Sequence, residues 1–173
     1  MIRKITALLA LTVCALPAHA VDGVSLELGG GNGADLWRAG AQWNWQRKWF
    51  TSGDWHVGGY WEVSLGAWDG GRKTVYDLGL TPVFRLEQRA PSGVAPYAEA
   101  AIGLHLLSRQ RITGQKEFST SWQFGDHLGA GIRFGAHRQY DLGLRLQHIS
   151  NASVKRPNPG INFLLLRFAY ELE

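Results

Sequence analysis

The chain has 173 residues and a formal net charge of +4, and two of these charges come from Arg3 and Lys4, which leaves +2 (4 − 2) for the rest. No run of lysines or arginines accompanies this small surplus, which excludes the charge pattern of a nucleic-acid-binding protein. The single cysteine is Cys14, inside the apolar N-terminal segment. A chain cleaved after that segment therefore has no disulfide, no thiolate nucleophile and no cysteine-ligated metal.

The first 20 residues have the pattern of a secretory signal peptide. A basic start is followed by the apolar run Ile5–Leu16, and Ala18-His19-Ala20 has the small-residue pattern of a cleavage site. The apolar run is shorter than the roughly 20 residues that a membrane-spanning helix requires. We therefore predict an exported protein with a signal peptide at residues 1–20 and a single domain at residues 21–173.

The rest of the chain alternates between apolar and polar residues, and this period of two predicts strands. In the second alternating segment, for example, Trp37, Trp43 and Trp45 fall on one face, opposite Arg38 and Gln42. Turn signals rich in glycine, asparagine, aspartate or proline separate several of the segments. In chain order, the predicted strands are residues 24–28, 37–46, 55–67, 76–87, 98–106, 123–134, 142–150 and 164–172.

Every predicted strand has one apolar face and one face of glycine, amide and charged residues. The chain contains 22 glycines, above the usual share of about 7%, and 8 tryptophans. Glycine suits tight barrels and tryptophan marks membrane interfaces. The pattern predicts an all-β fold, an eight-stranded antiparallel transmembrane β-barrel of the outer-membrane type with its apolar face outside. The alternative is a soluble lipocalin-like barrel, with the apolar face inside.

The even number of strands places both termini at one end of the barrel. We expect that end to face the periplasm, because bacterial barrels have short periplasmic turns and longer external loops. The predicted periplasmic turns are residues 48–54, 89–94 and 135–138. The predicted external loops are residues 29–35, 69–73, 108–120 and 151–160.

Polar residues stand on the apolar face of the seventh strand, near its external end. His148 and Ser150 continue the face of Leu146, and Asn162 on the next strand has the same outward parity. Strand pairing would bring Asp126 to the same level. Serine, histidine and an acid or amide are the parts of an ester hydrolase, since the serine needs a base and the base needs an orienting partner. The alternative is a polar girdle where the strands leave the membrane.

The run His148-Ile149-Ser150-Asn151-Ala152, followed by Pro157-Asn158-Pro159-Gly160, resembles the signature of the lipid A 3-O-deacylase (PagL) family. The resemblance extends more loosely through Phe124–Phe134 and the tryptophan-rich second strand. It implies an outer-membrane enzyme that hydrolyses the ester-linked acyl chain at the 3 position of lipid A, with lipopolysaccharide as substrate. No metal or organic cofactor is implied.

The same resemblance implies roles for individual residues. Ser150 would be the nucleophile and His148 its base. Asn158 would stabilise the oxyanion through its side chain, aided by a backbone N–H near Ser153. Lys155 and Arg156 in the same loop are suited to pairing with lipid A phosphates.

One position departs from the family pattern, because Asn162 stands where the family has a glutamate. An asparagine can orient a histidine by accepting a hydrogen bond, but it adds no charge. We therefore expect Asn162 or Asp126 to orient His148. Two other functions remain open at this point: a non-enzymatic structural or adhesion barrel of the outer membrane, and an acyltransferase acting on lipid A. The sequence also leaves open the acyl-chain preference and the oligomeric state, including a homodimer.

Overall fold

The computed structural model describes residues 20–71, 73–89 and 93–172. The predicted signal peptide lies outside the described residues, apart from Ala20. The described chain contains eight strands: β1 (Gly23–Gly31), β2 (Ala34–Asn44), β3 (Trp55–Asp69), β4 (Val75–Gln88), β5 (Ala95–Leu107), β6 (Trp122–Phe134), β7 (Tyr140–Ser150) and β8 (Ile161–Glu171).

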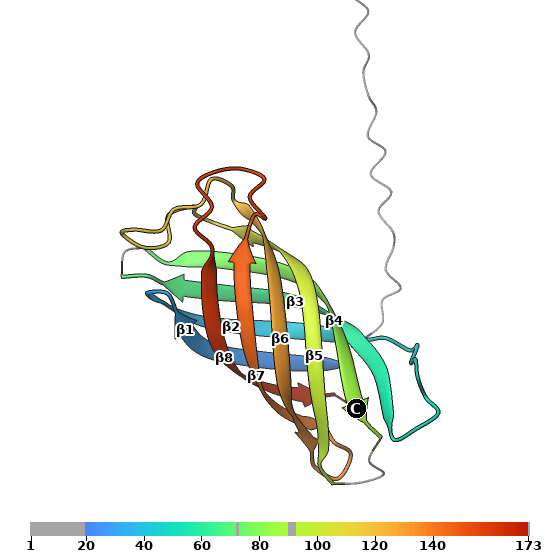
Figure 1. The fold of residues 1–173 in the computed structure, drawn as a ribbon. Coiled ribbons are helices and arrows are strands. Elements are labelled where there is room, and N and C mark those ends of the chain that lie inside the picture. Colours follow the sequence, from blue (N-terminus) through green and yellow to red (C-terminus); the bar gives the residue numbers. More distant parts are fainter. Residues whose placement is uncertain (1–19, 72, 90–92, 173) are drawn as a thin grey trace, which may run out of the picture.

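The strands form a closed antiparallel barrel, in which each strand pairs with its neighbours in the sequence and β1 pairs with β8 (Figure 1). The shortest strand has 9 residues and the longest 15, enough to cross a membrane when tilted. Closure leaves no unpaired strand edge. We call the end with both termini and the β2–β3, β4–β5 and β6–β7 connections the proximal end, and the opposite end the distal end. None of the described residues forms a helix long and apolar enough to cross a membrane.

The outer wall of the barrel is apolar, as predicted. Ile102 and Leu128 are each 67% exposed and Leu146 is 64% exposed, although all three lie within strands. Near the proximal end, Tyr140 stacks on Phe134 and Phe168 with ring centroids 5.5 and 6.4 Å apart. Such aromatic residues are typical of the level at which a barrel leaves the membrane. The lipocalin-like alternative is wrong, because it would bury these residues.

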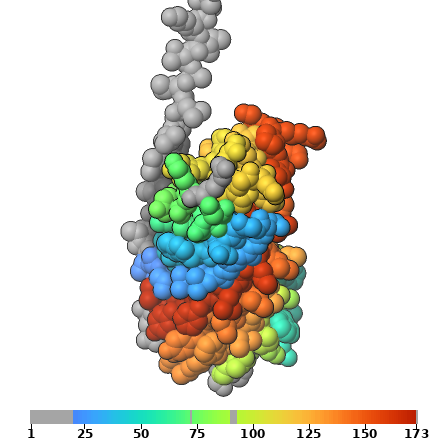
Figure 2. All heavy atoms as spheres, turned by 90° about the vertical axis from the view of Figure 1, so that its left-hand side faces the viewer, coloured from blue at the N-terminus to red at the C-terminus, as the bar shows by residue number. Residues whose placement is uncertain are grey.

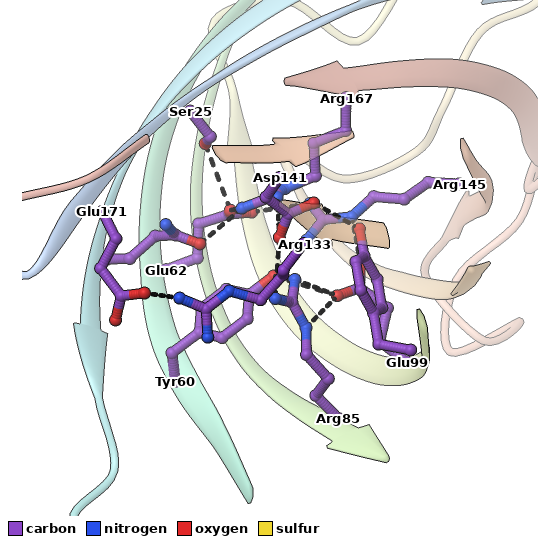
Figure 3. A network of polar contacts seen from close by, with 12 residues as sticks. Ser25, Tyr60, Glu62, Arg85, Glu99, Arg133, Asp141, Arg145, Arg167 and Glu171 are labelled. Atoms are coloured by element: carbon purple, nitrogen blue, oxygen red, sulfur yellow. Dashed lines mark hydrogen bonds and ion pairs between the residues drawn. The ribbon is translucent and has the colours of Figure 1, made fainter. Parts of the chain in front are cut away.

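Charged residues fill the middle of the barrel. Figure 3 shows Arg85, Arg145 and Arg167 close to the carboxylates of Glu62, Glu99 and Asp141, which come from β3, β5 and β7. Arg145 Nε lies 2.6 Å from Glu99 Oε1, and Arg85 Nη1 lies 2.7 Å from Asp141 Oδ2. A buried charge is costly unless it is paired, and each of these three arginines lies within ion-pair distance of a carboxylate. Arg167 Nε and Nη1 nevertheless make no hydrogen bond with any described residue. Buried charged side chains therefore fill the middle of the barrel.

The distal end of the interior is closed by an apolar cluster. Trp68 and Phe163 pack edge to face with ring centroids 5.2 Å apart. Ile112 and Phe118 come from the long β5–β6 loop and are almost fully buried in the same cluster. This loop, predicted as a polar external segment, therefore folds back over the barrel.

One predicted loop is shorter than expected. Residues 29–35 were predicted to form an external turn, yet β1 continues to Gly31 and only Asn32 and Gly33 separate it from β2. The glycines serve close approach instead: a Cβ at Gly29 or Gly31 would overlap backbone carbonyls of β8. Glycine in this position lets two strands pack tightly. A run of glycines is also typical of a turn, which is why the sequence predicted a longer loop here.

Candidate active site

His148 lies on the outer wall near the distal end, flanked on both sides by polar residues. In the strand register it is directly opposite Asp126 on β6 and directly opposite Asn162 on β8. Side chains in such opposite positions have Cβ atoms about 4.5–5.5 Å apart. The three residues therefore form one row across three strands, and His148 is in the centre.

Asn162 holds the imidazole. Its Oδ1 lies 2.6 Å from His148 Nδ1. An amide oxygen only accepts, so the hydrogen bond requires a proton on Nδ1 and leaves Nε2 with a free lone pair. The ring is thus in the tautomer that a general base needs. Asp126 is exposed beside it, and no direct hydrogen bond joins these two described residues.

Ser150 is the last residue of β7 and lies on the same face as His148. Its hydroxyl oxygen accepts a long hydrogen bond of 3.4 Å from the backbone N–H of Ala152. The chain then turns sharply, with φ of 51° at Ala152 and 61° at Ser153. Among the described residues, the N–H of Ser153 has no hydrogen-bond partner. This turn therefore brings backbone donors close to the Ser150 hydroxyl.

Asn158 is tied to the same turn. Its Oδ1 accepts a hydrogen bond of 3.1 Å from the backbone N–H of Asn151, the residue after Ser150. Within the described chain, its Nδ2 makes no hydrogen bond. A side-chain amide held by its oxygen presents its nitrogen as a fixed donor. An oxyanion requires such a donor, and this amide is held by the backbone of the residue that follows Ser150.

The loop that carries these groups is anchored by a buried asparagine. Asn151 is fully buried, and its Nδ2 donates to Lys155 O at 2.9 Å and to Ser119 Oγ at 3.1 Å. Ser119 N also donates to Pro157 O at 3.0 Å. Figure 2 shows the two loops, residues 108–121 and 151–160, side by side at the distal end. Each loop therefore holds the other in place.

Gly160 fixes the other side of the imidazole. Its φ is +62°, a conformation that favours glycine. A Cβ there would come within 2.7 Å of His148 Cε1, so the backbone packs directly against the ring. Lys116 Nζ donates to Gly160 O at 2.8 Å. Lys116 comes from the β5–β6 loop, more than forty residues away in the sequence.

Two supporting residues were not predicted from the sequence. Lys116 is one, and Asn32 is the other: Asn32 Oδ1 accepts a hydrogen bond of 2.7 Å from the backbone N–H of Asn162. Asn32 is at the tip of the β1–β2 turn with a φ of 51°. Asparagine beside glycine signals a turn, but nothing in the sequence shows that this turn reaches β8.

A pocket of about 510 Å³ lies beside the site, between the two long distal loops. Ser153 and Asn158 line it, together with Arg156. Its position next to the turn after Ser150 gives room for a polar group attached to a reacting ester. Lys155 and Arg156 are both exposed at this level.

Among the described residues, two histidine–carboxylate pairs lie inside the barrel. His105 Nδ1 lies 2.8 Å from Asp77 Oδ1, and His127 Nε2 lies 3.6 Å from Glu99 Oε1. All four side chains are almost completely buried in the charged network, so no substrate can reach them. In the described chain no group of three or more histidine, cysteine, aspartate or glutamate residues could hold a metal ion.

Comparisons with known proteins identify the family of the chain. A model of the lipid A 3-O-deacylase (PagL) family matches residues 35–171. The chain is 34% identical over 147 residues to the lipid A deacylase PagL of Pseudomonas aeruginosa, covering 83% of this chain and 82% of that protein. It is 33% identical over 114 residues to the lipid A deacylase PagL of Bordetella bronchiseptica, covering 64% of this chain and 60% of that protein.

A solved structure is similar over most of its length. The crystal structure of the outer membrane enzyme PagL superposes with a TM-score of 0.79 at 30% sequence identity, covering 87% of this chain and 99% of that one. The eight-stranded barrel is therefore shared with a structurally characterised outer-membrane enzyme.

Proposed function

The chain belongs to the lipid A 3-O-deacylase (PagL) family, and from that premise we propose that Ser150 is its nucleophile and His148 its general base. The protein is an ester hydrolase of the outer membrane that removes the 3-O-linked acyl chain of lipid A. The non-enzymatic barrel and the acyltransferase are thereby excluded. The proposal concerns the residues that perform the reaction.

One observation supports these roles most directly. His148 shares the outward face of β7 with Ser150, and its Nδ1 is hydrogen-bonded to Asn162 Oδ1. The free Nε2 can then take the proton of Ser150 as the oxygen attacks the ester carbonyl. No hydrogen bond joins Ser150 and His148 among the described residues, and such bonds often tighten only when substrate is bound.

The reaction then proceeds in two halves. Ser150 Oγ forms a bond to the carbonyl carbon while its proton passes to His148, and the negative oxygen is stabilised by the Asn158 side-chain amide and the Ser153 N–H. The tetrahedral intermediate breaks the bond to the sugar oxygen, which takes the proton from His148. Water, deprotonated by His148, next attacks the acyl carbon bound to Ser150. The bond to Ser150 Oγ then breaks, His148 returns the proton to that oxygen, and the fatty acid leaves.

The position on the outer wall suits a lipid substrate. The ester of lipid A lies just below the sugar headgroup in the outer leaflet, and the distal rim of the barrel meets that level if the long loops face outward. The acyl chains then lie along the apolar wall, and the headgroup reaches the pocket lined by Arg156. Substrate does not have to leave the membrane.

The test compares two serines of the same turn. Ser150→Ala should abolish the loss of a hydroxyacyl chain from purified lipid A, measured by mass spectrometry. Ser153→Ala is the matched control, because it removes a hydroxyl and keeps the backbone N–H, and it should stay active. Both variants should show the strand signal of the folded barrel by circular dichroism. Full activity in Ser150→Ala would refute the assignment of the nucleophile.

A further inference from the structure

The proximal mouth of the barrel contains a cavity that the deacylase reaction does not use. It has a volume of about 600 Å³ and lies at the opposite end of the barrel from His148. The charged network and the distal apolar cluster separate this cavity from the distal end of the barrel. Its lining includes Lys48, His56, Arg89, Arg133 and Arg138.

The lining has more positive than negative charge, with five arginine or lysine residues and two glutamates. Glu87 and Glu171 are both engaged by Arg133, whose Nη1 lies 3.3 Å from Glu87 Oε1 (Figure 3 shows the pair with Glu171). The charge of Arg85 is compensated by its ion pair with Asp141 in the interior network. The two carboxylates of the lining are therefore already occupied.

The positive charge that these pairs leave uncompensated belongs to Lys48, Arg89 and Arg138. Lys48 and Arg89 are exposed at the mouth, and within the described residues neither forms an ion pair. Arg138 lies 3.9 Å from Glu87, a longer and weaker contact. Three cationic side chains thus surround the mouth with little compensating charge.

A buried polar atom in the lining points to a missing partner. His56 is only 7% exposed, yet its Nδ1 is buried and has no hydrogen bond. The ring is within electrostatic reach of Lys48, Arg89 and Arg138, and also of Glu87, which is directly opposite it on β4 and is paired with Arg133. Gly58 lies between the two side chains, since a Cβ there would be in van der Waals contact with His56 Cδ2 at 3.8 Å and with Lys48 Cγ at 3.9 Å. A buried polar atom usually has a partner, and His56 Nδ1 lies in the wall of the cavity with cations nearby.

We propose that this proximal cavity binds a small phosphate-bearing anion through Lys48, Arg89, Arg138 and His56. Cations that approach from several elements match a tetrahedral, multiply charged group better than a planar carboxylate, and arginine binds phosphate in a bidentate manner. The volume exceeds that of inorganic phosphate and is in the range of pockets for small organic ligands. The ligand is therefore either free phosphate or a sugar phosphate from the proximal side, which is the periplasm if the long loops face outward.

The experiment measures binding to the full barrel in detergent. Inorganic phosphate and glucose 6-phosphate are titrated separately by isothermal calorimetry, and Trp45 in the lining gives a second signal by fluorescence. We expect saturable 1:1 binding of one or both. The tighter of the two probes identifies the source of the phosphate group.

Variants locate the site. The double variant Lys48→Gln/Arg89→Gln should raise the Kd at least tenfold, and His56→Phe should raise it several-fold. The control Lys73→Gln/Arg109→Gln removes two exposed cations from the distal end, and should bind normally. All of these variants should retain deacylase activity, which separates this inference from the proposed catalytic roles. Absence of saturable binding, or an equal loss in the control, would overturn the proposal.

Discussion

Replacing Asn162 with aspartate tests how His148 is activated. The two side chains have the same length, so a carboxylate oxygen can take the place of Oδ1, which lies 2.6 Å from His148 Nδ1. The histidine keeps its tautomer and gains a negative neighbour. We expect Asn162→Asp to deacylate lipid A faster, because in the proposed mechanism the carboxylate would stabilise the imidazolium that forms when Ser150 gives its proton to His148.

The magnitude follows from the exposure of the pair. Two unit charges about 4 Å apart attract each other by about 1 kcal/mol in water and about 4 kcal/mol near a protein surface. His148 is half-buried and Asn162 is exposed, which favours the lower part of this range. A stabilisation of about 1–3 kcal/mol corresponds to a rise in kcat of roughly 5- to 150-fold.

The size of the rise in kcat depends on whether Asp126 already stabilises the imidazolium of His148. Asp126 is directly opposite His148 on the other side, on β6. If its carboxylate already stabilises the imidazolium, Asp126→Asn should lower kcat, and Asn162→Asp should give a larger gain in the Asp126→Asn background than alone. Residues that act on one group are coupled in this way.

The assay is a time course of acyl-chain loss by mass spectrometry for the native protein, the two single variants and the double variant. Gln46→Glu adds a negative charge near the proximal end and serves as the control for net charge. If Asn162→Asp and Asp126→Asn both leave kcat unchanged, neither side chain acts on His148 and the reasoning is wrong.

Three further variants test the surroundings. Gly160→Ala should reduce deacylation about 100-fold, the scale of loss for a misplaced catalytic group, because the new Cβ displaces His148; an unchanged rate would show that the ring does not depend on this glycine. Lys116→Met should lower kcat about fivefold through loss of one hydrogen bond, and Lys116→Arg should restore part of it; equal rates in all three proteins would contradict the role. Arg145→Met should destabilise the barrel by about 3–5 kcal/mol, as measured by guanidinium unfolding, because Glu62 loses its ion pair with Arg145 at 3.0 Å and keeps only the one with Arg167 at 3.7 Å; adding Glu62→Gln should recover part, and an unchanged midpoint would contradict the coupling.

The faces of the barrel were predictable because strand geometry is local. Alternation alone assigns Leu146 to one face and Gln147 to the other, and a closed barrel with an apolar outside follows once every strand shows the same pattern. Interior contacts between strands that are not neighbours were not predictable. Arg38 is directly opposite Glu27 on β1, but it also reaches Asp77 on β4 at 2.9 Å, and such a contact depends on the stagger of the closed sheet.

The same distinction applies to the site. The row from Asp126 through His148 to Asn162 could be anticipated, since short connections constrain which residues of consecutive strands pair. The contributions of Asn32 and Lys116 could not. Each comes from a loop whose path over the rim is set by tertiary packing, such as the burial of Ile112 and Phe118, and not by local pattern.

The interior network gives a physical reason why a site on the outer wall can keep its geometry. Lipid tails are fluid and do not hold His148 or Ser150 in place from outside, so the rotamers must be fixed by the protein itself. Within the wall, Asn162 and Gly160 contact the imidazole directly, and the distal loops fix those two residues through Asn32 and Lys116. The strands beneath are cross-linked by buried ion pairs that resist changes in register. Catalytic groups positioned on rigid strands and supported by a second layer are held more precisely than groups on free loops, which is what a reaction at the edge of a fluid membrane requires.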